Sequence, residues 1–308
     1  MKILYDYQIF DMQVTGGISR YHADLYNACK QCGHEPILGL KYTSNIYIER
    51  EEDFKKSYSS EDAFIPRLDF KGKNLIYKFF EKNGIVPKSS WDKNAQFCRD
   101  CLKSYKYDIF HPTYYDDTYS DVEINAPIVL TIHDMIYESY PQFFWYNSVI
   151  KRKKEWAERA TGIIAISEFT KKEILRYYDS IDESKIHVIH HGIDLSGIDN
   201  IRINKSKDNY ILFVGERWLY KDFFTLLRSI RLLNLNGIDL KLKVVGRAFH
   251  ESESNYIDFM GINDKVENLG RVSDEKLEEL YSKAMLYVST SLSEGFGLPL
   301  LECMKYGT

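Results

Sequence analysis

The chain has 308 residues, of which 44% are hydrophobic and 15% aromatic, so it can bury a substantial core. At about 150 residues per domain, this length predicts two domains. Its 41 Lys and Arg residues are balanced by 45 Asp and Glu residues, for a net charge of -4, which excludes the basic excess expected of a nucleic-acid-binding protein. No apolar run approaches the ~20 residues that span a bilayer, and the start turns polar too early for a signal peptide, so we expect a cytoplasmic protein.

The first part of the chain alternates strand and helix patterns. A strand pattern at 1–9 is followed by a glycine-bearing loop at 15–19 and by helical spacing that stops at Gly33. Because short apolar strands alternate with helices, we expect a parallel sheet covered on both faces. The further expected strands lie at 35–40, 107–111, 126–134, 161–167 and 185–193, and the expected helices at 151–160 and at 168–178, the latter capped by Ser167.

After Asp194 the polar stretch 195–209 has no helical or strand period and is predicted to be an interdomain linker. The alternation then restarts, which predicts a second α/β sheet and two domains, residues 1–195 and 196–308. Ligands of such sheets bind at the carboxyl ends of the strands, so we expect the site in a cleft between the domains. The second domain's expected strands lie at 210–215, 240–246, 266–270 and 285–291, and its helices at 221–237, 253–261 and 273–284.

Four of the five cysteines form two C-x2-C pairs, Cys29/Cys32 and Cys98/Cys101. Zinc-binding pairs of this type are usually separated by about 15–20 residues, and here the interval is much longer. Both pairs fall in helical patterns, where positions i and i+3 share one face. We therefore interpret them as half-buried free thiols, with a zinc site as the alternative.

The last stretch of the chain brackets a glycine-rich turn with two carboxylates, Glu294 and Glu302. Gly295 and Gly297 allow the backbone to approach a ligand, and Pro299 suits the first turn of a helix whose free N–H groups favour an anion. Carboxylates accept paired hydroxyl hydrogen bonds, as a ribose or sugar diol requires. The alternative is a Gly/Pro turn with a capping glutamate.

Glycines and cations occupy two strand-to-helix loops. Arg217 and Lys221 follow the first strand of the second domain, where two cations can meet a diphosphate, and the alternative is a pair of solvated surface charges. Gly16 and Gly17 lie in the first loop of the chain, a common place for backbone to approach phosphate. The G-x-G-x-x-G pattern is absent there, so a dinucleotide site is not indicated.

His133 ends an apolar strand pattern, so it is expected to face the site and to hydrogen-bond a substrate or transfer a proton, with a structural histidine as the alternative. A second histidine group, His187, His190 and His191, resembles a metal cluster. Strand alternation places His190 on the opposite face from the other two, which argues against a shared metal. The chain also has no Asp-x-Asp pair for holding a metal–diphosphate complex, so we expect the positive charge to come from side chains.

Taken in order, these motifs resemble a retaining glycosyltransferase of family 4 with the GT-B fold, of the type that builds bacterial surface polysaccharides. The resemblance covers nearly the whole chain, and Glu294 and Glu302 match the family's E-x7-E motif. The motifs that carry it are TGGISRY, HPTYYDD, TIHDMIYESYP, AISEFTKKEI, HHGID, FVGERWLYKDF, LGRVSDEKLEELYSKA and SEGFGLPLLECMKYG.

The resemblance implies a role for each matching residue. It implies that the first domain faces the acceptor and that the second binds a nucleotide sugar. One departure is Glu216, which separates Gly215 from Arg217 where many members have Gly-Arg directly. The implied roles are: Glu294 on the transferred sugar; Glu302 on the ribose; Phe296, Gly297 and Leu298 as backbone contacts; Arg217 and Lys221 on the diphosphate; Gly16 and Gly17 on the same diphosphate; His133 near the sugar; Arg271 and Val272 at the nucleobase.

The implied reaction is transfer of a hexose from a nucleotide-diphosphate sugar to a glycan or lipid-linked acceptor, without a metal ion or other cofactor, by front-face attack with retention. The FVGxRxxYK pattern favours GDP-mannose. A phosphorylase, an epimerase or a nucleotide-sugar-binding protein without turnover are the alternatives. Because relatives continue beyond the matching Gly-Thr, we also expect a C-terminally truncated second domain with reduced stability. The basic segments 71–84 and 151–156 suggest peripheral contact with the inner face of the membrane, the alternative being solvated helix faces.

Overall fold

The computed structural model divides the chain into two compact units. The first contains Met1–Met135 and Tyr146–Ile189, and the second contains Ile136–Trp145 and His190–Thr308. The predicted boundary at 195/196, the linker up to residue 206 and most of the basic segment 71–84 lie outside the described residues. The structure describes residues 1–48, 54–59, 76, 78, 80, 82, 88–119, 121–144, 148–193, 207–217 and 219–308.

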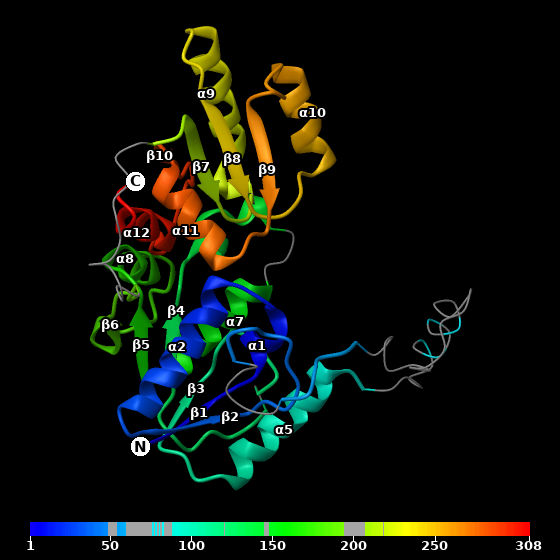
Figure 1. Ribbon diagram of the computed structural model, residues 1–308. Coiled ribbons are helices and arrows are strands. Elements are labelled where there is room, and N and C mark those ends of the chain that lie inside the picture. Colours follow the sequence, from blue (N-terminus) through cyan, green and yellow to red (C-terminus); the bar gives the residue numbers. More distant parts are fainter. Residues whose placement is uncertain are drawn as a thin grey trace. The chain divides into compact units, whose positions relative to one another are not determined.

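The first unit is built on parallel strands, as predicted. They form two three-stranded sheets of order β2-β1-β3 and β4-β5-β6, and a bridge between Phe110 and Ile128 connects β3 to the chain just before β4. The strands are β1 (Lys2–Tyr5), β2 (Glu35–Leu38), β3 (Ile109–His111), β4 (Val129–Ile132), β5 (Gly162–Ala165) and β6 (Ile186–Val188). The helices that follow them include α1 (Gln8–Met12), α2 (Gly17–Gln31), α5 (Ser90–Ser104), α7 (Ser148–Arg159) and α8 (Glu168–Tyr177) (Figure 1).

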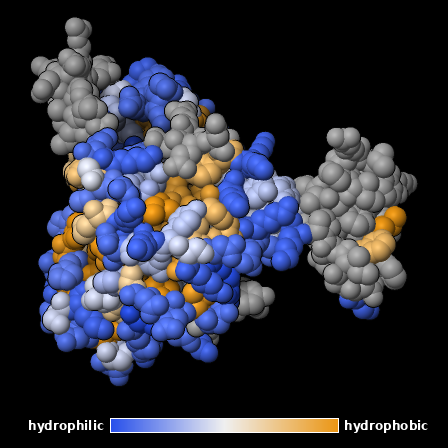
Figure 2. Space-filling model, turned by 90° about the horizontal axis from the view of Figure 1, so that it is seen from below, coloured by the Kyte–Doolittle hydropathy of each residue, from blue (hydrophilic) through white to orange (hydrophobic). Residues whose placement is uncertain are grey.

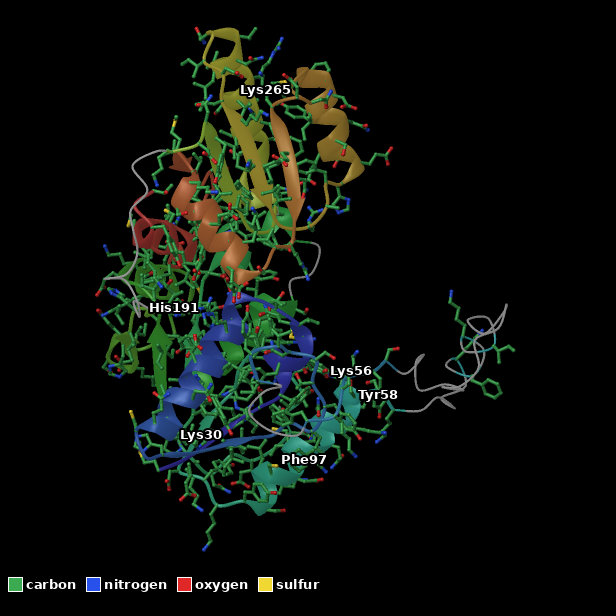
Figure 3. The ribbon with its side chains drawn as sticks, viewed as in Figure 1. Lys30, Lys56, Tyr58, Phe97, His191 and Lys265 are labelled. Carbon is green, nitrogen blue, oxygen red and sulfur yellow. The ribbon has the colours of Figure 1, made fainter. Side chains whose placement is uncertain are left out.

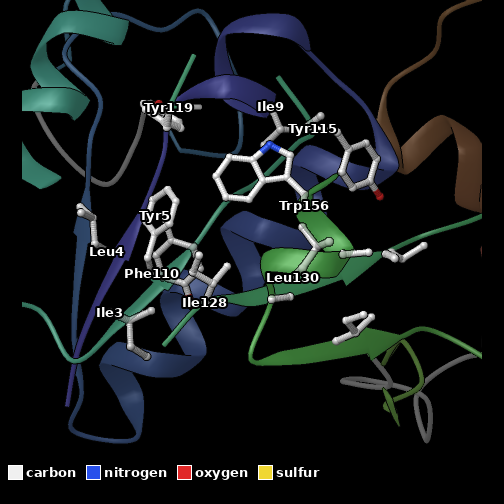
Figure 4. Packing of buried hydrophobic residues seen from close by; sticks show 14 of the residues in the cluster. Ile3, Leu4, Tyr5, Ile9, Phe110, Tyr115, Tyr119, Ile128, Leu130 and Trp156 are labelled. Carbon is white, nitrogen blue, oxygen red and sulfur yellow. The ribbon is translucent and has the colours of Figure 1, made fainter. Parts of the chain in front are cut away.

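One hydrophobic core holds this unit together. Strand residues such as Leu4, Phe110 and Leu130 are fully buried, and Trp156 of α7 packs among them (Figure 4). The Ser167 hydroxyl accepts a 3.0 Å hydrogen bond from the Thr170 N–H, which confirms the predicted cap of α8. The surface is mixed in character: Figure 2 shows one face of the molecule on which polar side chains cover most of the area, with apolar side chains between them.

The second unit has one parallel sheet of order β10-β7-β8-β9. Alternate residues of β7 enter different cores: Ile211 packs with α9 and α10, whereas Leu212 packs with α11 and α12. The sheet is therefore covered on both faces, as the sequence predicts. Its elements are β7 (Tyr210–Val214), α9 (Phe223–Leu235), β8 (Lys241–Val245), α10 (Glu251–Met260), β9 (Val266–Gly270), α11 (Asp274–Lys283), β10 (Leu286–Tyr287) and α12 (Leu298–Lys305), with a 3-10 turn, η4, at Leu219–Lys221 (Figure 1).

Several elements are shorter than predicted or begin elsewhere. The strand expected at 285–291 ends at Tyr287, after which the Val288 N–H makes a last bond to the Leu212 carbonyl. The helix expected from residue 221 begins at Phe223, because Asp222 adopts a left-handed φ of 45° and accepts the Thr225 N–H as its N-cap. Residues 136–144, which follow β4, form α6 (Ile136–Ser139) and a 3-10 turn, η1 (Pro141–Phe143), and belong to the second unit.

The five cysteines are free thiols, with Cys98 and Cys101 buried. Within the described ranges there is no group of three or more His, Cys, Asp or Glu side chains arranged to hold a metal ion. In the same ranges, every helix is too short or too polar to cross a bilayer.

Candidate functional site

Lys221 and Glu294, which the sequence assigns to one site, form an ion pair. The Lys221 Nζ lies 2.5 Å from Glu294 Oε1, and the two side chains are 20% and 33% exposed. The Ser291 hydroxyl donates a 2.6 Å hydrogen bond to the same carboxylate oxygen. Two donors therefore fix the Glu294 carboxylate, which keeps one edge accessible.

The turn between Glu294 and α12 requires its glycine. Gly297 is the N-cap of α12 and has a left-handed φ of 85°, and a Cβ there would lie 3.2 Å from Leu300 Cδ1. Pro299 occupies the first turn of the helix, and no side chain caps its N-terminus. The left-handed backbone at position 297 therefore accounts for the glycine there.

Glu302 lies one turn inside α12 and is held by a tyrosine that the sequence did not single out. The Tyr281 hydroxyl donates a 3.0 Å hydrogen bond to Glu302 Oε2. Burial raises the pKa of Tyr287, and the charges of Glu294, Cys303 and Glu302 raise it further. Tyr281 thus anchors Glu302, whereas Lys221 anchors Glu294 in the loop before α12.

Arg217 is not a solvated surface charge, which was the alternative interpretation of this residue. Its side chain is fully buried, and it donates from Nε to Glu253 Oε1 at 2.8 Å and from Nη2 to the carbonyls of Arg247 and Ala248 at 2.9 Å. Its Nη1 has no hydrogen-bond partner among the described residues. The described contacts include no hydrogen bond or ion pair from Arg217 to Lys221 or Glu294, and its Nη1 is buried with the rest of the side chain.

Glu216, the departure from the family pattern, belongs to a charged network at the carboxyl ends of three strands. Its carboxylate lies 3.3 Å from Arg247 Nε and 3.9 Å from Arg271 Nη2. Arg247 also approaches Glu253 at 3.6 Å. Burial raises the pKa of Glu253, but its hydrogen bonds to Arg217 and the His250 N–H outweigh burial and leave that pKa lowered.

Arg247 and Glu253 were not among the predicted site residues, although Arg247 follows β8 as Arg217 follows β7. The rule that selected Arg217, a cation just after a strand of a parallel sheet, applies equally to Arg247. Of the two residues expected at the nucleobase, Arg271 has a side chain that is 69% exposed, and Val272 packs against the core shared by α11 and α12.

In the first unit, the glycine loop is closed by a glutamine. Gly16 is the N-cap of α2, and a Cβ there would collide with the Gln13 side chain. Gln13 Oε1 accepts the Ser19 N–H at 3.1 Å, and the Ser19 hydroxyl donates to the Gly16 carbonyl at 3.1 Å. A Cβ at Gly17 would meet nothing within 4 Å, so a phosphate that approaches α2 has open space at Gly17 and competes with Gln13 for the Ser19 N–H.

His133 follows β4 at its carboxyl end, as predicted, and is 8% exposed. Its ring packs edge-on against Tyr21 and His22, with centroids 5.1 and 5.8 Å apart, and His22 in turn contacts His111 at 5.3 Å. Burial lowers the pKa of His111 to about 4, and its Nε2 lies 3.0 Å from the Thr131 hydroxyl. His111 was not predicted as a site residue, although it is the last residue of β3 and His133 directly follows β4.

His190 and His191 do not lie on opposite faces of a strand, so the prediction from alternation was wrong. β6 ends at Val188, and the rings of His190 and His191 both contact Phe296, with centroids 5.7 and 5.3 Å apart. Figure 3 labels His191. Burial lowers the pKa of His191 to about 4. Phe296, which the resemblance assigns to the site, thus has two histidine rings as neighbours.

Basic side chains of α7 form hydrogen bonds and ion pairs with other residues of the first unit. Lys153 is buried and donates to the Asp134 carbonyl at 3.0 Å, and Arg152 lies 3.3 Å from an Asp116 carboxylate oxygen. Lys154 lies within 4.0 Å of Glu158, and the most exposed of the four, Lys151, is 80% exposed. Lys153 and Arg152 are therefore occupied by partners within the first unit, whereas Lys151 remains exposed and Lys154 partly exposed.

The chain is similar to proteins that assemble surface glycans. It is 30% identical over 184 residues to the O-antigen chain mannosyltransferase RfbU of Salmonella typhimurium, a match that covers 58% of this chain and 50% of the relative. It is 30% identical over 197 residues to the D-rhamnosyltransferase WbpZ of Pseudomonas aeruginosa, covering 60% and 48%. The chain spans about half the length of these curated relatives.

Two solved structures have the same arrangement of elements. A mutant form of TarM from S. aureus, in complex with fondaparinux, α-GlcNAc-glycerol and UDP, gives a TM-score of 0.70 over 99% of this chain and 84% of its own. WaaG, a glycosyltransferase involved in lipopolysaccharide biosynthesis, gives 0.61 over 100% and 79%. Their identities of 14% and 16% make this a likeness of fold, the two-domain GT-B fold.

Two family models match successive parts of the chain. The model of glycosyl transferases group 1 matches residues 198–308, which contain Arg217, Lys221, Glu294 and Glu302. The model of Glycosyltransferase Family 4 matches residues 15–196, more than half of the chain, and begins just before the glycine loop. By its sequence and its fold, this chain belongs to Glycosyltransferase Family 4.

Proposed function

We propose that this protein is a retaining glycosyltransferase that moves a hexose, mannose first among candidates, from a nucleotide-diphosphate sugar to a glycan or lipid-linked acceptor. The observation that carries the proposal is the Lys221–Glu294 ion pair, with Glu302 eight residues on, beside the uncapped N-terminus of α12. These groups suit a ligand that has both an anionic diphosphate and sugar hydroxyls.

The proposed roles follow from the charge of each group. Breaking the anomeric bond develops negative charge on the departing diphosphate, and Lys221, the N–H groups of α12 and the positive charge of Arg217 are assigned to stabilise it. Glu294 accepts hydrogen bonds from hydroxyls of the transferred sugar, and Glu302 accepts them from the ribose. Fixed dipoles and paired side chains need little reorganisation as the charge appears.

The first unit contributes the remaining assigned groups. Gly17 leaves space for a phosphate beside α2, and His133 is assigned to the transferred sugar. We assign no covalent nucleophile. The acceptor hydroxyl attacks from the side of the leaving group, and its proton passes to the departing phosphate, so the anomeric configuration is retained. We also propose that the protein acts in the cytoplasm.

The relatives support the choice of donor class. RfbU is named as a mannosyltransferase and WbpZ as a rhamnosyltransferase, so a hexose or deoxyhexose is the expected group. We propose GDP-mannose as the donor. The absence of an Asp-x-Asp pair from the sequence supports a reaction in which Lys221 and Arg217, not a metal ion, neutralise the diphosphate.

The test is a transfer assay with GDP-mannose, UDP-glucose, UDP-N-acetylglucosamine and ADP-glucose, each with and without a chelator, against a pool of lipid-linked and free glycan acceptors. We expect α-linked mannose in the product, undiminished turnover with chelator, and loss of donor binding in Glu302→Ala. Release of sugar phosphate or isomerisation of the donor would identify a phosphorylase or an epimerase instead. Donor binding by calorimetry without consumption in any acceptor pool would identify a binding protein.

A further inference from the structure

The loop that carries Glu294 is folded against the 3-10 turn η4. The Leu292 N–H donates to the Tyr220 carbonyl at 2.8 Å, and the Thr290 hydroxyl donates to the Lys221 carbonyl at 2.9 Å. The 2.5 Å contact between the Glu294 carboxylate and Lys221 is a third link between the loop and η4. The position of Glu294 therefore depends on the shape of this loop, residues 289–297.

One end of the loop is held by residues 136–144. The Tyr140 hydroxyl donates a 3.1 Å hydrogen bond to the Leu292 carbonyl, across 152 residues of sequence. The Tyr140 ring stacks on Phe143, with centroids 5.9 Å apart and an interplanar angle of 10°, and Phe144 approaches Tyr220 at 6.2 Å. The aromatic segment 136–144 thus contacts both the loop and η4, the turn that contains Lys221.

The other end of the loop is held by a second segment. The rings of His191 and Phe296 form a T-shaped pair, with centroids 5.3 Å apart and an interplanar angle of 87°, and His190 contacts the same ring at 5.7 Å in a tilted arrangement. A T-shaped contact favours one ring orientation over others. Tyr140 contacts Leu292, two residues before Glu294, and His191 contacts Phe296, two residues after it.

Both segments enter the second unit directly from chain that belongs to the first. Residues 136–144 follow Met135, close after His133, and His190 follows Ile189. We propose that Tyr140 and His191 are positioning residues that set the shape of the 289–297 loop and hold Glu294 where it meets the transferred sugar. The inference rests on the proposed function, because that function gives Glu294 its substrate contact.

The test measures the loop and the reaction separately. In Tyr140→Phe, which keeps the ring and loses one hydrogen bond, we expect amide exchange in residues 289–297 to rise about 2- to 10-fold while exchange in β8 stays unchanged. We expect kcat for transfer from GDP-mannose to fall by a similar factor with the donor KM within about twofold, because Glu294 is misplaced in the transition state more than in the ground state. Tyr105→Phe, at an exposed tyrosine of the first unit, is the matched control.

His191 gives an independent pair of variants. His191→Ala should raise exchange near Phe296 and lower kcat, and His191→Phe, which restores a ring, should recover both. Loop exchange that is unchanged in Tyr140→Phe and His191→Ala overturns the positioning role whatever the activity. A loosened loop with kcat at the wild-type value overturns it as well. A loosened loop in a protein whose wild-type form transfers no sugar supports the positioning role and refutes the proposed function.

Discussion

The buried pair of Arg217 and Glu253 gives the sharpest prediction on stability. The Arg217 side chain is 0% exposed and that of Glu253 is 5% exposed, and their closest atoms are 2.8 Å apart. Removing one partner of such a pair leaves an uncompensated buried charge. For Glu253→Gln we therefore expect a loss of about 3–5 kcal/mol in the free energy of unfolding of the second unit.

The magnitude follows from what remains after the substitution. The amide that replaces the Glu253 carboxylate keeps the side-chain volume and one acceptor oxygen, so the packing of α10 is not the quantity that changes. The Arg217 guanidinium retains its bonds to the carbonyls of Arg247 and Ala248 but loses its counter-charge, and water cannot reach it. The cost is thus mainly that of an unpaired charge in a low-dielectric environment.

The assay is urea unfolding followed by fluorescence and by circular dichroism, because a chain of two units can unfold in two transitions. Glu279→Gln breaks the 2.7 Å pairs with Lys276 and Lys283 on an exposed face of α11, and as a control it should change stability little. A combined Arg217→Met and Glu253→Leu variant should recover part of the loss, since apolar side chains remove the unpaired charge. A loss from Glu253→Gln no larger than that of the control would refute the reasoning.

Three further predictions test buried and ligand-facing groups. Burial raises the pKa of Asp6 to about 7, so the unfolded chain releases this proton first as pH rises, and stability should fall between about pH 4 and pH 7 by at most about 4 kcal/mol; melts of Asp6→Asn, subtracted from wild type at each pH, should show that decline. A Cβ at Gly39 would lie 2.5 Å from Cys98 Sγ, so Gly39→Ala should cost about 1–3 kcal/mol by urea unfolding, with partial recovery in a double variant with Cys98→Ala. Tyr281→Phe removes the 3.0 Å bond to Glu302 and should weaken donor binding in calorimetry about 2- to 10-fold, less than Glu302→Gln does; equal binding in both variants would contradict this role.

The sheets were predictable because their patterns are local. Residues Tyr210 to Val214 are apolar throughout, and helical spacing follows them, which is the signature of a strand covered on both faces. The meeting of Lys221 and Glu294 was also predictable, since both follow strands of one parallel sheet and such ends share an edge. Strand lengths were not, because the strand expected to run to Ser291 makes its last hydrogen bond to β7 from the Val288 N–H, and pairing of this kind is not visible in the sequence pattern.

The sequence pattern does not predict which residues contact the candidate site residues. Arg217 is oriented by Glu253, 36 residues away, and nothing in the sequence distinguishes that glutamate from the other acidic residues of α10. Gln13 explains the need for glycine at position 16 better than a ligand does, and only the structure shows its side chain in that place. Membership of residues 136–144 in the second unit is likewise a matter of tertiary packing, which local periodicity does not report.

The cations of the second unit differ in how freely they can meet a ligand. Lys221 and Arg247 are 20% and 30% exposed and are paired with carboxylates, whereas Arg217 is fully buried and bonded at Nε and Nη2. An anionic ligand that enters this unit can therefore reach Lys221 and Arg247, whereas it can reach Arg217 only if the residues that bury its side chain move. Glu216, the residue that departs from the family pattern, lies 3.3 Å from Arg247 and 3.9 Å from the more exposed Arg271, so two of these cations share its carboxylate.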